Sequence, residues 1–383
     1  MLRLPPFRFL QPRTLDEAAR MLAGEGAGDG QPVRLVAGGT DLWPNMKRRH
    51  QKAGTVVSLM RVAGLAGIEE RGTDRAASEE DRTAAGSDHP AADRSPAGGE
   101  VRLGATTLLA EVAGSPLVAA RFPALARAVA SISSPPLREM GTIGGNVCVD
   151  TRCTYYNQTE EWRRSIDYCM KEEGTICWVA TSSPRCWAHS ASDAAPMLCA
   201  LDARVRLVSA ASERVVPIAA LYRDDGIDYL AKRPDEIVAD LLLPAASDAA
   251  ACRTAFWKLR RRGSIDFAVL SAAVALWSDS AGRVSRARIF LGAVGSQPVA
   301  AEEAAALLAG QPLSPESAAA AGRLARKAAT PMDNTDFQAQ WRGAMVARYA
   351  EAALREAGGL PAERLPPKHG LPILDGAAAA PPP

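Results

Sequence analysis

The sequence predicts a protein of mixed helix and strand with two or three domains. The chain has 383 residues, which is long enough for more than one hydrophobic core. In the first part, short apolar runs read as buried strands and end in glycines. Beyond a cysteine-rich stretch, strand-like runs alternate with turns and are followed by alanine-rich helices.

The N-terminal elements can be placed in order. A helix is predicted to begin at Thr14, because this hydroxyl residue and Glu17 form a capping box. Buried strands are predicted at 33–37 and 55–60, a strand at 101–107 and a helix at 118–132. From Glu69 to Glu100 the sequence has almost no large apolar residue, so we expect a flexible excursion there.

The C-terminal half is expected to contain an antiparallel sheet. Strands are predicted over 203–210, 235–244, 253–262, 266–278 and 285–294, and the last three lie close together along the chain. Helices are predicted over about 299–309, 316–328 and 335–357. We therefore divide the chain into a first subdomain (1–62), a flexible polar insertion (63–100), a second subdomain (101–245), a C-terminal domain (250–358) and a disordered tail (359–383).

Composition excludes several classes of partner. The 45 basic residues nearly balance 43 acidic ones, and aromatic residues make up 5%, so a nucleic-acid surface with stacking rings is not expected. No apolar run approaches the roughly 20 residues that span a bilayer, and the N-terminus lacks an apolar signal-peptide core. We expect a cytoplasmic protein without membrane contact.

Two short glycine motifs end apolar runs. Leu35-Val-Ala-Gly-Gly-Thr-Asp-Leu42 and Thr142-Ile-Gly-Gly-Asn146 each pair adjacent glycines with a hydroxyl residue. Without Cβ atoms, several backbone N–H groups can converge on a phosphate, so the two loops could hold the two phosphates of a dinucleotide. Neither motif is GxGxxG or the lysine-bearing P-loop, and for either alone a plain glycine turn is the alternative.

The seven cysteines are unevenly placed, and six fall between Cys148 and Cys199. In a reducing cytosol, such a cluster is more often metal-binding or catalytic than disulfide-bonded. From Cys153 the next three follow at intervals of 16, 8 and 9 residues. Four thiolates can hold a [4Fe–4S] cluster or a structural zinc ion, although no CxxC knuckle typical of zinc is present. Spacing leaves open iron–sulfur, zinc and unliganded cysteines.

Together with their surroundings, these motifs resemble the flavoprotein (medium) subunits of the molybdenum hydroxylases, the xanthine dehydrogenase family. The resemblance covers nearly the whole chain and is carried by LVAGGTDL, LGATT, MGTIGGN, SDAAPMLCALDA, FWK and LGAVGSQPVAAEEAAALLAG. It implies FAD as cofactor. It also implies an α+β fold: an FAD-binding domain of the vanillyl-alcohol-oxidase/PCMH type in two subdomains, then a C-terminal α+β domain of the CO dehydrogenase flavoprotein type, with an antiparallel sheet and helices.

The resemblance also implies a set of flavin contacts. Lys258 could stabilise a reduced, anionic flavin, or its charge could simply reach solvent beside the arginines that follow. Asp193 could instead cap a helix. The implied cofactor-binding residues are Leu35, Val36, Ala37, Gly38, Gly39, Thr40, Asp41, Leu42, Ile132, Thr142, Ile143, Gly144, Gly145, Asn146, Thr154, Asp193, Val238 and Lys258.

The segment from residue 148 to 190, named the insert from here on, lengthens the path from Asn146 to Asp193 beyond that of most family members. Its motifs DTRCTYYNQ, YCMK and RCW resemble the β subunit of 4-hydroxybenzoyl-CoA reductase. That resemblance implies a [4Fe–4S] cluster held by Cys153, Cys169, Cys177 and Cys186. Cys148, Cys199 and Cys252 are then expected to be small buried residues, and His189 is not expected to be a ligand.

The implied function is electron transfer within an aromatic-compound-degrading complex. The chain would carry no catalytic residue and would work with a molybdopterin-binding large subunit and a [2Fe–2S] small subunit, as a dimer of heterotrimers. Electrons from ferredoxin or a similar donor would pass through the cluster and FAD, for reductive dehydroxylation of an aromatic acyl-CoA. Alternatives are the flavin subunit of an oxidative hydroxylase of the xanthine or CO dehydrogenase type, and a non-enzymatic scaffold with a zinc-stabilised loop.

Overall fold

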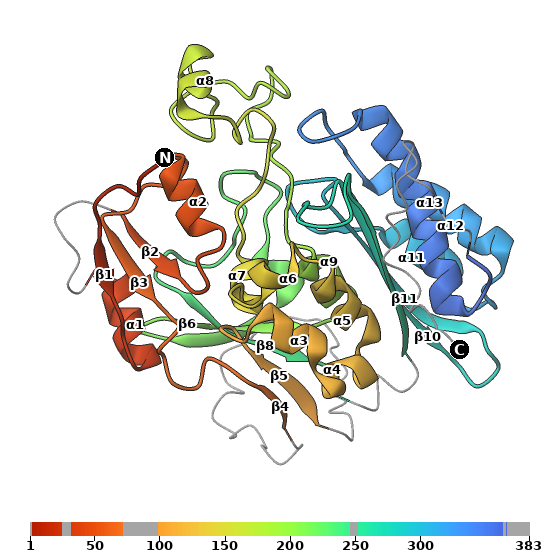
Figure 1. Ribbon diagram of the computed structural model, residues 1–383. Coiled ribbons are helices and arrows are strands. Elements are labelled where there is room, and N and C mark those ends of the chain that lie inside the picture. The colour runs from red at the N-terminus through yellow and green to blue at the C-terminus, as the bar shows by residue number, and fades with distance from the viewer. Residues whose placement is uncertain (1, 25–31, 72–98, 246–251, 363–364, 366–383) are drawn as a thin grey trace, which may run out of the picture.

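The computed structural model describes residues 2–24, 32–71, 99–245, 252–362 and 365. Three sheets follow one another along the chain, each with its own helices (Figure 1). The predicted polar insertion lies partly outside the described residues, and so does most of the predicted tail.

The N-terminal subdomain is a small parallel sheet with two helices. Strand β3 lies between β1 and β2, and its residues are buried because neighbours cover both of its edges. Helix α1 begins as predicted, with Thr14 Oγ1 accepting from the Glu17 amide at 3.1 Å. The elements are β1 (Arg8–Leu10), α1 (Leu15–Leu22), β2 (Val33–Val36), α2 (Leu42–Lys47) and β3 (Thr55–Ser58).

The second subdomain is a five-stranded antiparallel sheet covered by short helices. The strand order is β4-β5-β8-β6-β7, and the central strand β8 is buried along its whole length. Its strands are β4 (Ile68–Arg71), β5 (Glu100–Gly104), β6 (Arg204–Val208), β7 (Glu213–Pro217) and β8 (Ile237–Leu243). Its helices are α3 (Leu109–Gly114), α4 (Pro116–Arg121), α5 (Pro123–Ala130), α6 (Pro135–Arg138), α7 (Ile143–Val147), α9 (Ala194–Ala200) and the 3₁₀ helix η2 (Ile218–Leu221).

Two predictions for this subdomain were wrong. The single helix expected over 118–132 is two helices, because Phe122 leaves the helical conformation at φ −135° and Pro123 starts α5. The polar excursion expected from Glu69 begins with ordered structure, since β4 pairs with β5 in antiparallel register.

The C-terminal domain is the predicted antiparallel sheet with helices on one face. Alternate residues of β9 point to opposite sides, as a strand requires. Ala255, Trp257 and Leu259 pack against α12 and α13, whereas Phe256 packs into the core of the second subdomain. The elements are β9 (Cys252–Leu259), β10 (Leu270–Ser278), β11 (Val284–Gly292), β12 (Val299–Ala300), α11 (Glu302–Leu308), α12 (Pro315–Ala328) and α13 (Ala339–Gly358).

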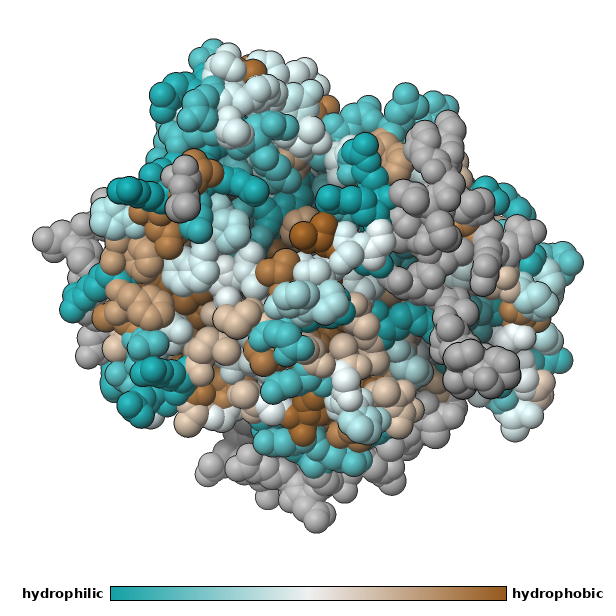
Figure 2. Space-filling view, in the orientation of Figure 1, coloured by the Kyte–Doolittle hydropathy of each residue, from teal (hydrophilic) through white to brown (hydrophobic). Residues whose placement is uncertain are grey.

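The insert projects from the junction of the three parts. It carries one helix, α8 (Glu160–Ser165), and otherwise consists of turns. In Figure 1 it rises at the top between α2 of the N-terminal subdomain and the C-terminal helices, and its visible surface in Figure 2 is largely hydrophilic. No helix within the described ranges is both long and apolar enough to cross a membrane.

Candidate functional site

The two predicted glycine loops line one cavity of about 480 Å³, named the glycine cavity from here on. This volume falls within the range of small-molecule pockets, roughly 300–1,000 Å³. Of the predicted cofactor-binding residues, those that line it are Leu35, Val36, Ala37, Gly38, Gly39, Thr40, Asp41, Leu42, Ile132, Thr142, Gly144, Gly145, Asn146 and Val238. The structure therefore brings together segments of the first subdomain and of the second subdomain, including its strand β8.

Glycine is required where the two loops touch. A Cβ atom on Gly38 would overlap the main-chain carbonyl of Met140, and one on Gly39, which has φ +71°, would overlap the indole of Trp43. A Cβ on Gly144 would lie 2.6 Å from that of Ala105. The first loop can approach the segment that leads into the second only because Gly38 has no side chain.

Side chains of the second loop serve the fold around the cavity. Thr142 Oγ1 accepts from the Gly145 amide at 3.1 Å and starts α7. Asn146 Oδ1 accepts from Ser192 Oγ at 2.8 Å and from the Ala194 amide at 3.3 Å, so it caps α9. These bonds fix the loop conformation before any ligand is considered.

Four of the predicted cofactor-binding residues do not line the glycine cavity. Ile143 is fully buried in the core of the second subdomain, and Thr154 is exposed, its amide donating to the Asn334 carbonyl at 2.8 Å. Asp193 and Lys258 form a buried ion pair, with Lys258 Nζ 2.7 Å from Asp193 Oδ2. Lys258 does not reach solvent, so that alternative was wrong. Asp193 stands at the N-cap of α9 as the alternative for that residue predicted, although its side chain makes no cap hydrogen bond.

Several residues that were not predicted from the sequence also line the glycine cavity. They include Gln51, Asp150, Tyr229 and Phe267, which together with the predicted Asp41 are named the rim from here on. Gln51 Nε2 donates to Asp150 Oδ2 at 3.1 Å. The DTRC motif was the available signal, but its acidic residue was grouped with the cysteines rather than with the cavity.

Charge at this rim is largely compensated. Burial raises the pKa of Asp41, and an ion pair with the buried guanidinium of Arg152 acts against that rise. Arg152 also lies 4.8 Å from the ring centre of Phe267. For Asp150, burial alone would raise the pKa, but the ammonium of Lys171 lowers it below the usual value.

The four predicted ligand cysteines line a second cavity, named the cysteine cavity from here on. Their thiols are buried, with 5–9% of each residue exposed. Aromatic and apolar side chains complete the wall. The lining residues are Cys153, Tyr155, Tyr156, Cys169, Met170, Lys171, Cys177, Trp178, Val179, Cys186 and Ala188. Residues spread over 36 positions of an insert with one short helix thus meet around one space.

Burial favours the protonated thiol at Cys153, Cys169 and Cys186 when nothing is bound. It raises the pKa of Cys153 to about 11 and that of Cys186 to about 12, and it also raises the pKa of Cys169. Space beside Cys186 is tight, because a Cβ on Gly226 would lie 2.6 Å from its Sγ. Among the described residues, no group of three or more His, Cys, Asp and Glu side chains is arranged to hold a metal ion.

The other cysteines and His189 lie outside this cavity. Cys199 is buried, whereas Cys148 and Cys252 are only partly buried, so the prediction of buried residues holds fully for Cys199. Cys148 lines the glycine cavity. His189 Nδ1 lies 2.9 Å from the Ser190 carbonyl, and its burial lowers its pKa to about 3.

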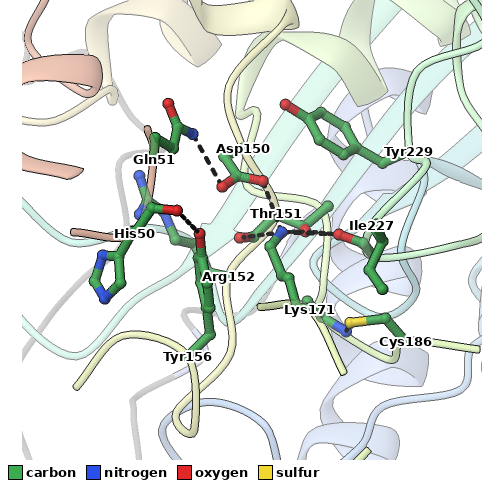
Figure 3. A network of polar contacts seen from close by, with 12 residues as sticks. His50, Gln51, Asp150, Thr151, Arg152, Tyr156, Lys171, Cys186, Ile227 and Tyr229 are labelled. Carbon is green, nitrogen blue, oxygen red and sulfur yellow. Dashed lines mark hydrogen bonds and ion pairs between the residues drawn. The ribbon is translucent and has the colours of Figure 1, made fainter. Parts of the chain in front are cut away.

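Polar contacts fasten the insert to the first subdomain. Tyr156 Oη donates to the His50 carbonyl at 2.8 Å, and Arg163 donates to the Arg48 carbonyl at 2.7 Å while pairing with Glu172. Figure 3 shows the tyrosine contact beside the cluster of polar groups around Asp150. The cysteine cavity is therefore held against the same subdomain that supplies one loop of the glycine cavity.

Two family models cover most of the chain. The model of the FAD binding domain in molybdopterin dehydrogenase matches residues 5–76 and 93–246, and that of the CO dehydrogenase flavoprotein C-terminal domain matches residues 254–357. The first alone spans more than half of the sequence. The boundary between the two models falls at the predicted start of the C-terminal domain.

Known proteins of similar length share this organisation. The chain is 25% identical over 353 residues to the 6-hydroxypseudooxynicotine dehydrogenase complex subunit alpha of Paenarthrobacter nicotinovorans, covering 92% of this chain and 95% of that protein. It is 24% identical to the carbon monoxide dehydrogenase medium chain of Hydrogenophaga pseudoflava, covering 92% and 97%.

A solved structure confirms the predicted fold class. Carbon monoxide dehydrogenase from Hydrogenophaga pseudoflava matches with a TM-score of 0.71 at 25% identity, covering 93% of this chain and 99% of that one. None of these names refers to an aromatic acyl-CoA reductase, so the closeness to 4-hydroxybenzoyl-CoA reductase stays a prediction.

Proposed function

Because this chain belongs to the family of FAD-binding medium subunits of the molybdenum hydroxylases, we propose that it carries electrons between FAD and a [4Fe–4S] cluster in the insert. FAD, when bound, would exchange electrons in pairs or singly. Main-chain groups of Leu35–Leu42 and Thr142–Asn146 would hold it in the glycine cavity. The observation that carries the proposal is a second cavity lined by four cysteines in the same chain.

The donor set of the cysteine cavity supports a cluster. Four thiolates are the ligands of a [4Fe–4S] cubane, in which each iron takes one soft sulfur ligand. A structural zinc ion needs four sulfurs about 2.3 Å from one point. The cysteines Cys153, Cys169, Cys177 and Cys186 line a shared space. The chain has no CxxC knuckle of the kind that zinc sites usually use, which favours the cluster over zinc.

The relatives named above are a complex subunit alpha and a medium chain, and neither name mentions a cluster. The cluster proposal therefore rests on the insert of this chain alone. An added one-electron carrier is what a reductase needs, because strongly reducing electrons must be brought in from a donor such as ferredoxin. On this basis the complex would act as a reductase of 4-hydroxybenzoyl-CoA or a related aromatic acyl-CoA.

The proposed assembly follows the family. This chain would bind a molybdopterin-binding large subunit and a [2Fe–2S] small subunit, in a dimer of heterotrimers in the cytoplasm. Substrate would be transformed on the large subunit, and the residues of this chain would bind and orient the flavin and exclude water from the cysteine cavity.

An oxidative function is the second candidate. It is favoured by the relatives, whose names describe dehydrogenases of carbon monoxide and of a nicotine derivative. In that case, electrons would leave the complex through FAD, and the insert would carry them outward.

The purified complex distinguishes these functions. We expect four iron atoms and one FAD in this chain, and a cluster midpoint potential below that of the flavin. A cluster potential well above the flavin potential would support the oxidative candidate instead. A protein that contains zinc and no iron would contradict both cluster functions.

A further inference from the structure

One buried ion pair joins the walls of the two cavities. Lys171 lines the cysteine cavity and Asp150 lines the glycine cavity. Lys171 Nζ lies 2.7 Å from Asp150 Oδ1, and the side chains are only 5% and 7% exposed. Figure 3 shows the ammonium pointing from the insert toward the carboxylate. The pair is therefore a shared element of both sites.

Neutral groups hold the ammonium in place. Lys171 Nζ donates to the main-chain carbonyls of Gly226 at 2.8 Å and Thr151 at 3.3 Å, and also to the Thr151 hydroxyl. The ring centres of Tyr156 and Tyr229 lie 5.0 and 5.6 Å from Nζ. Among the described residues that line the cysteine cavity, Lys171 is the only lysine, arginine or acidic residue. Its ammonium is therefore the one charge that the described wall presents to a bound group.

The carboxylate is oriented toward the other cavity. Asp150 Oδ2 accepts from Gln51, which also lines the glycine cavity, while Oδ1 takes the ammonium. The neighbouring pair of Arg152 and Asp41 has only its acidic member on a cavity wall. Among the ion pairs described above, only Lys171 and Asp150 place one charge on each wall.

We propose that Lys171 and Asp150 form a fixed charge pair that sets the difference in reduction potential between the two redox sites. This inference rests on the proposed cluster. Lys171 would raise the reduction potential of the cluster in the cysteine cavity, and Asp150 would lower that of the flavin in the glycine cavity. Both residues act through their charge, and neither transfers an electron itself.

The sign of each effect follows from charge. In the relevant step, a one-electron donor protein gives one electron to the cluster, which makes the site more negative by one charge while no bond forms or breaks. A buried cation nearby stabilises the reduced form and raises its potential, and a buried anion lowers it. Coulomb's law at an effective dielectric constant of about 20 gives an effect of roughly tenfold on the reduction equilibrium at about 10 Å.

Two substitutions at this pair have opposite expected effects. Lys171→Met should reduce the equilibrium constant for one-electron reduction of the cluster about tenfold, which is about 59 mV for one electron. Asp150→Asn should raise the cluster and flavin potentials, with the larger shift at the flavin because the carboxylate lines that cavity. Lys171→Arg, which keeps the charge, should restore most of the cluster potential.

Lys52→Met is the matched control. Lys52 also pairs with an acidic residue of the insert, Glu173, at 2.7 Å, but the two side chains are 69% and 55% exposed. Water and salt screen such a pair, so the potentials should not move. The measurement is a redox titration of the whole complex, with the cluster followed by electron paramagnetic resonance and FAD by absorbance, after iron and FAD content are determined.

The outcomes separate this inference from the proposed function. If the unsubstituted complex contains no iron, the proposed cluster is wrong. The charge-pair inference alone is wrong if Lys171→Met and Asp150→Asn both retain iron and FAD but leave the potentials unchanged. It is also wrong if the two substitutions shift the cluster potential in the same direction. Should Lys171→Met lose its iron, Asp150→Asn decides: a raised potential supports the inference and an unchanged one overturns it.

Discussion

The described wall of the glycine cavity includes five glycines and joins two subdomains, whereas the described wall of the cysteine cavity has no glycine and lies within one insert. Segments that are far apart in the sequence meet at the first, and glycines let them approach each other. The second is formed within one insert that has a single short helix. The first cavity therefore depends on the packing of the whole fold, and the second on a few side chains and their anchors.

This difference predicts how independently the two sites can be lost. Damage to the loop contacts should disturb the subdomain junction itself, because the glycines sit between packed elements. Damage to a cysteine should leave that junction intact, since the insert projects from it (Figure 1). The following substitutions test this contrast, beginning with the largest expected effect.

Gly38→Ala should abolish FAD binding and lower the yield of folded protein. Its Cβ would overlap the Met140 carbonyl, so the main chain of both loops would have to move. Gly114→Ala is the control, because a Cβ there meets no atom within 4 Å. FAD content per chain and the thermal midpoint measure the effect. Normal flavin content in Gly38→Ala would show that the loops do not need their close approach.

Cys169→Ala should remove the cluster's paramagnetic signal while FAD content stays near one per chain. The thiol lines only the cysteine cavity, so the glycine cavity keeps its walls. Cys199→Ala is a suitable control, because that residue is buried elsewhere and should not affect iron. Simultaneous loss of FAD and iron in Cys169→Ala would mean that the insert is part of the flavin site rather than an addition to it.

Lowering the pH should loosen the insert before the rest of the fold. His50 lies between the first subdomain and the insert, with Nε2 3.1 Å from the Gln158 carbonyl. Burial, followed by the nearby Arg163 charge, lowers its pKa to about 4 from the usual value near 6.5. As the pH falls from 7 to 5, His50 takes up a proton when the insert is detached from the first subdomain, but stays neutral when the insert is packed on it. The free energy that holds the insert in place should therefore fall by about 2 kcal/mol.

Hydrogen exchange of the insert measured between pH 7 and pH 5 checks this expectation. His50→Gln, which cannot take up a proton in this range, should remove most of the pH dependence. If hydrogen exchange of the insert depends on pH equally in the unsubstituted protein and in His50→Gln, the pH effect belongs to other groups. The main-chain amides of Thr142–Asn146 serve as an internal reference, because they belong to the glycine cavity and not to the insert.

Local patterns were sufficient to predict much of this molecule. Strands of the C-terminal sheet follow from alternating apolar runs, and the glycine loops and the four cysteines are visible as short motifs. Strand β1 was missed because it is only three residues long, too short to show an alternating pattern. The break at Phe122 did have a local signal, because the following Pro123 disfavours the helical conformation of the residue before it.

Pairs of residues far apart in the sequence could not be predicted from these motifs. Asp193 and Lys258 were each singled out, but their ion pair depends on how α9 and β9 pack. The pair of Lys171 and Asp150 forms only when the insert turns back on its own first residues. In both cases, burial makes the partner obligatory, but burial is a property of the folded chain.

The contact between Asn334 and the insert has a consequence for biosynthesis. Its carbonyl accepts from the Thr154 amide at 2.8 Å, and its side chain donates to the Trp187 carbonyl at 2.5 Å, beside the first and last of the four cysteines. Arg342 of α13 holds this loop through the Met332 carbonyl at 2.8 Å. The cysteines leave the ribosome long before Asn334 and Arg342 do. The contacts that hold the insert are therefore complete only after the last domain is translated. Maturation of the proposed metal site is therefore expected to follow synthesis of the chain, and nascent chains that end before α13 should not retain iron.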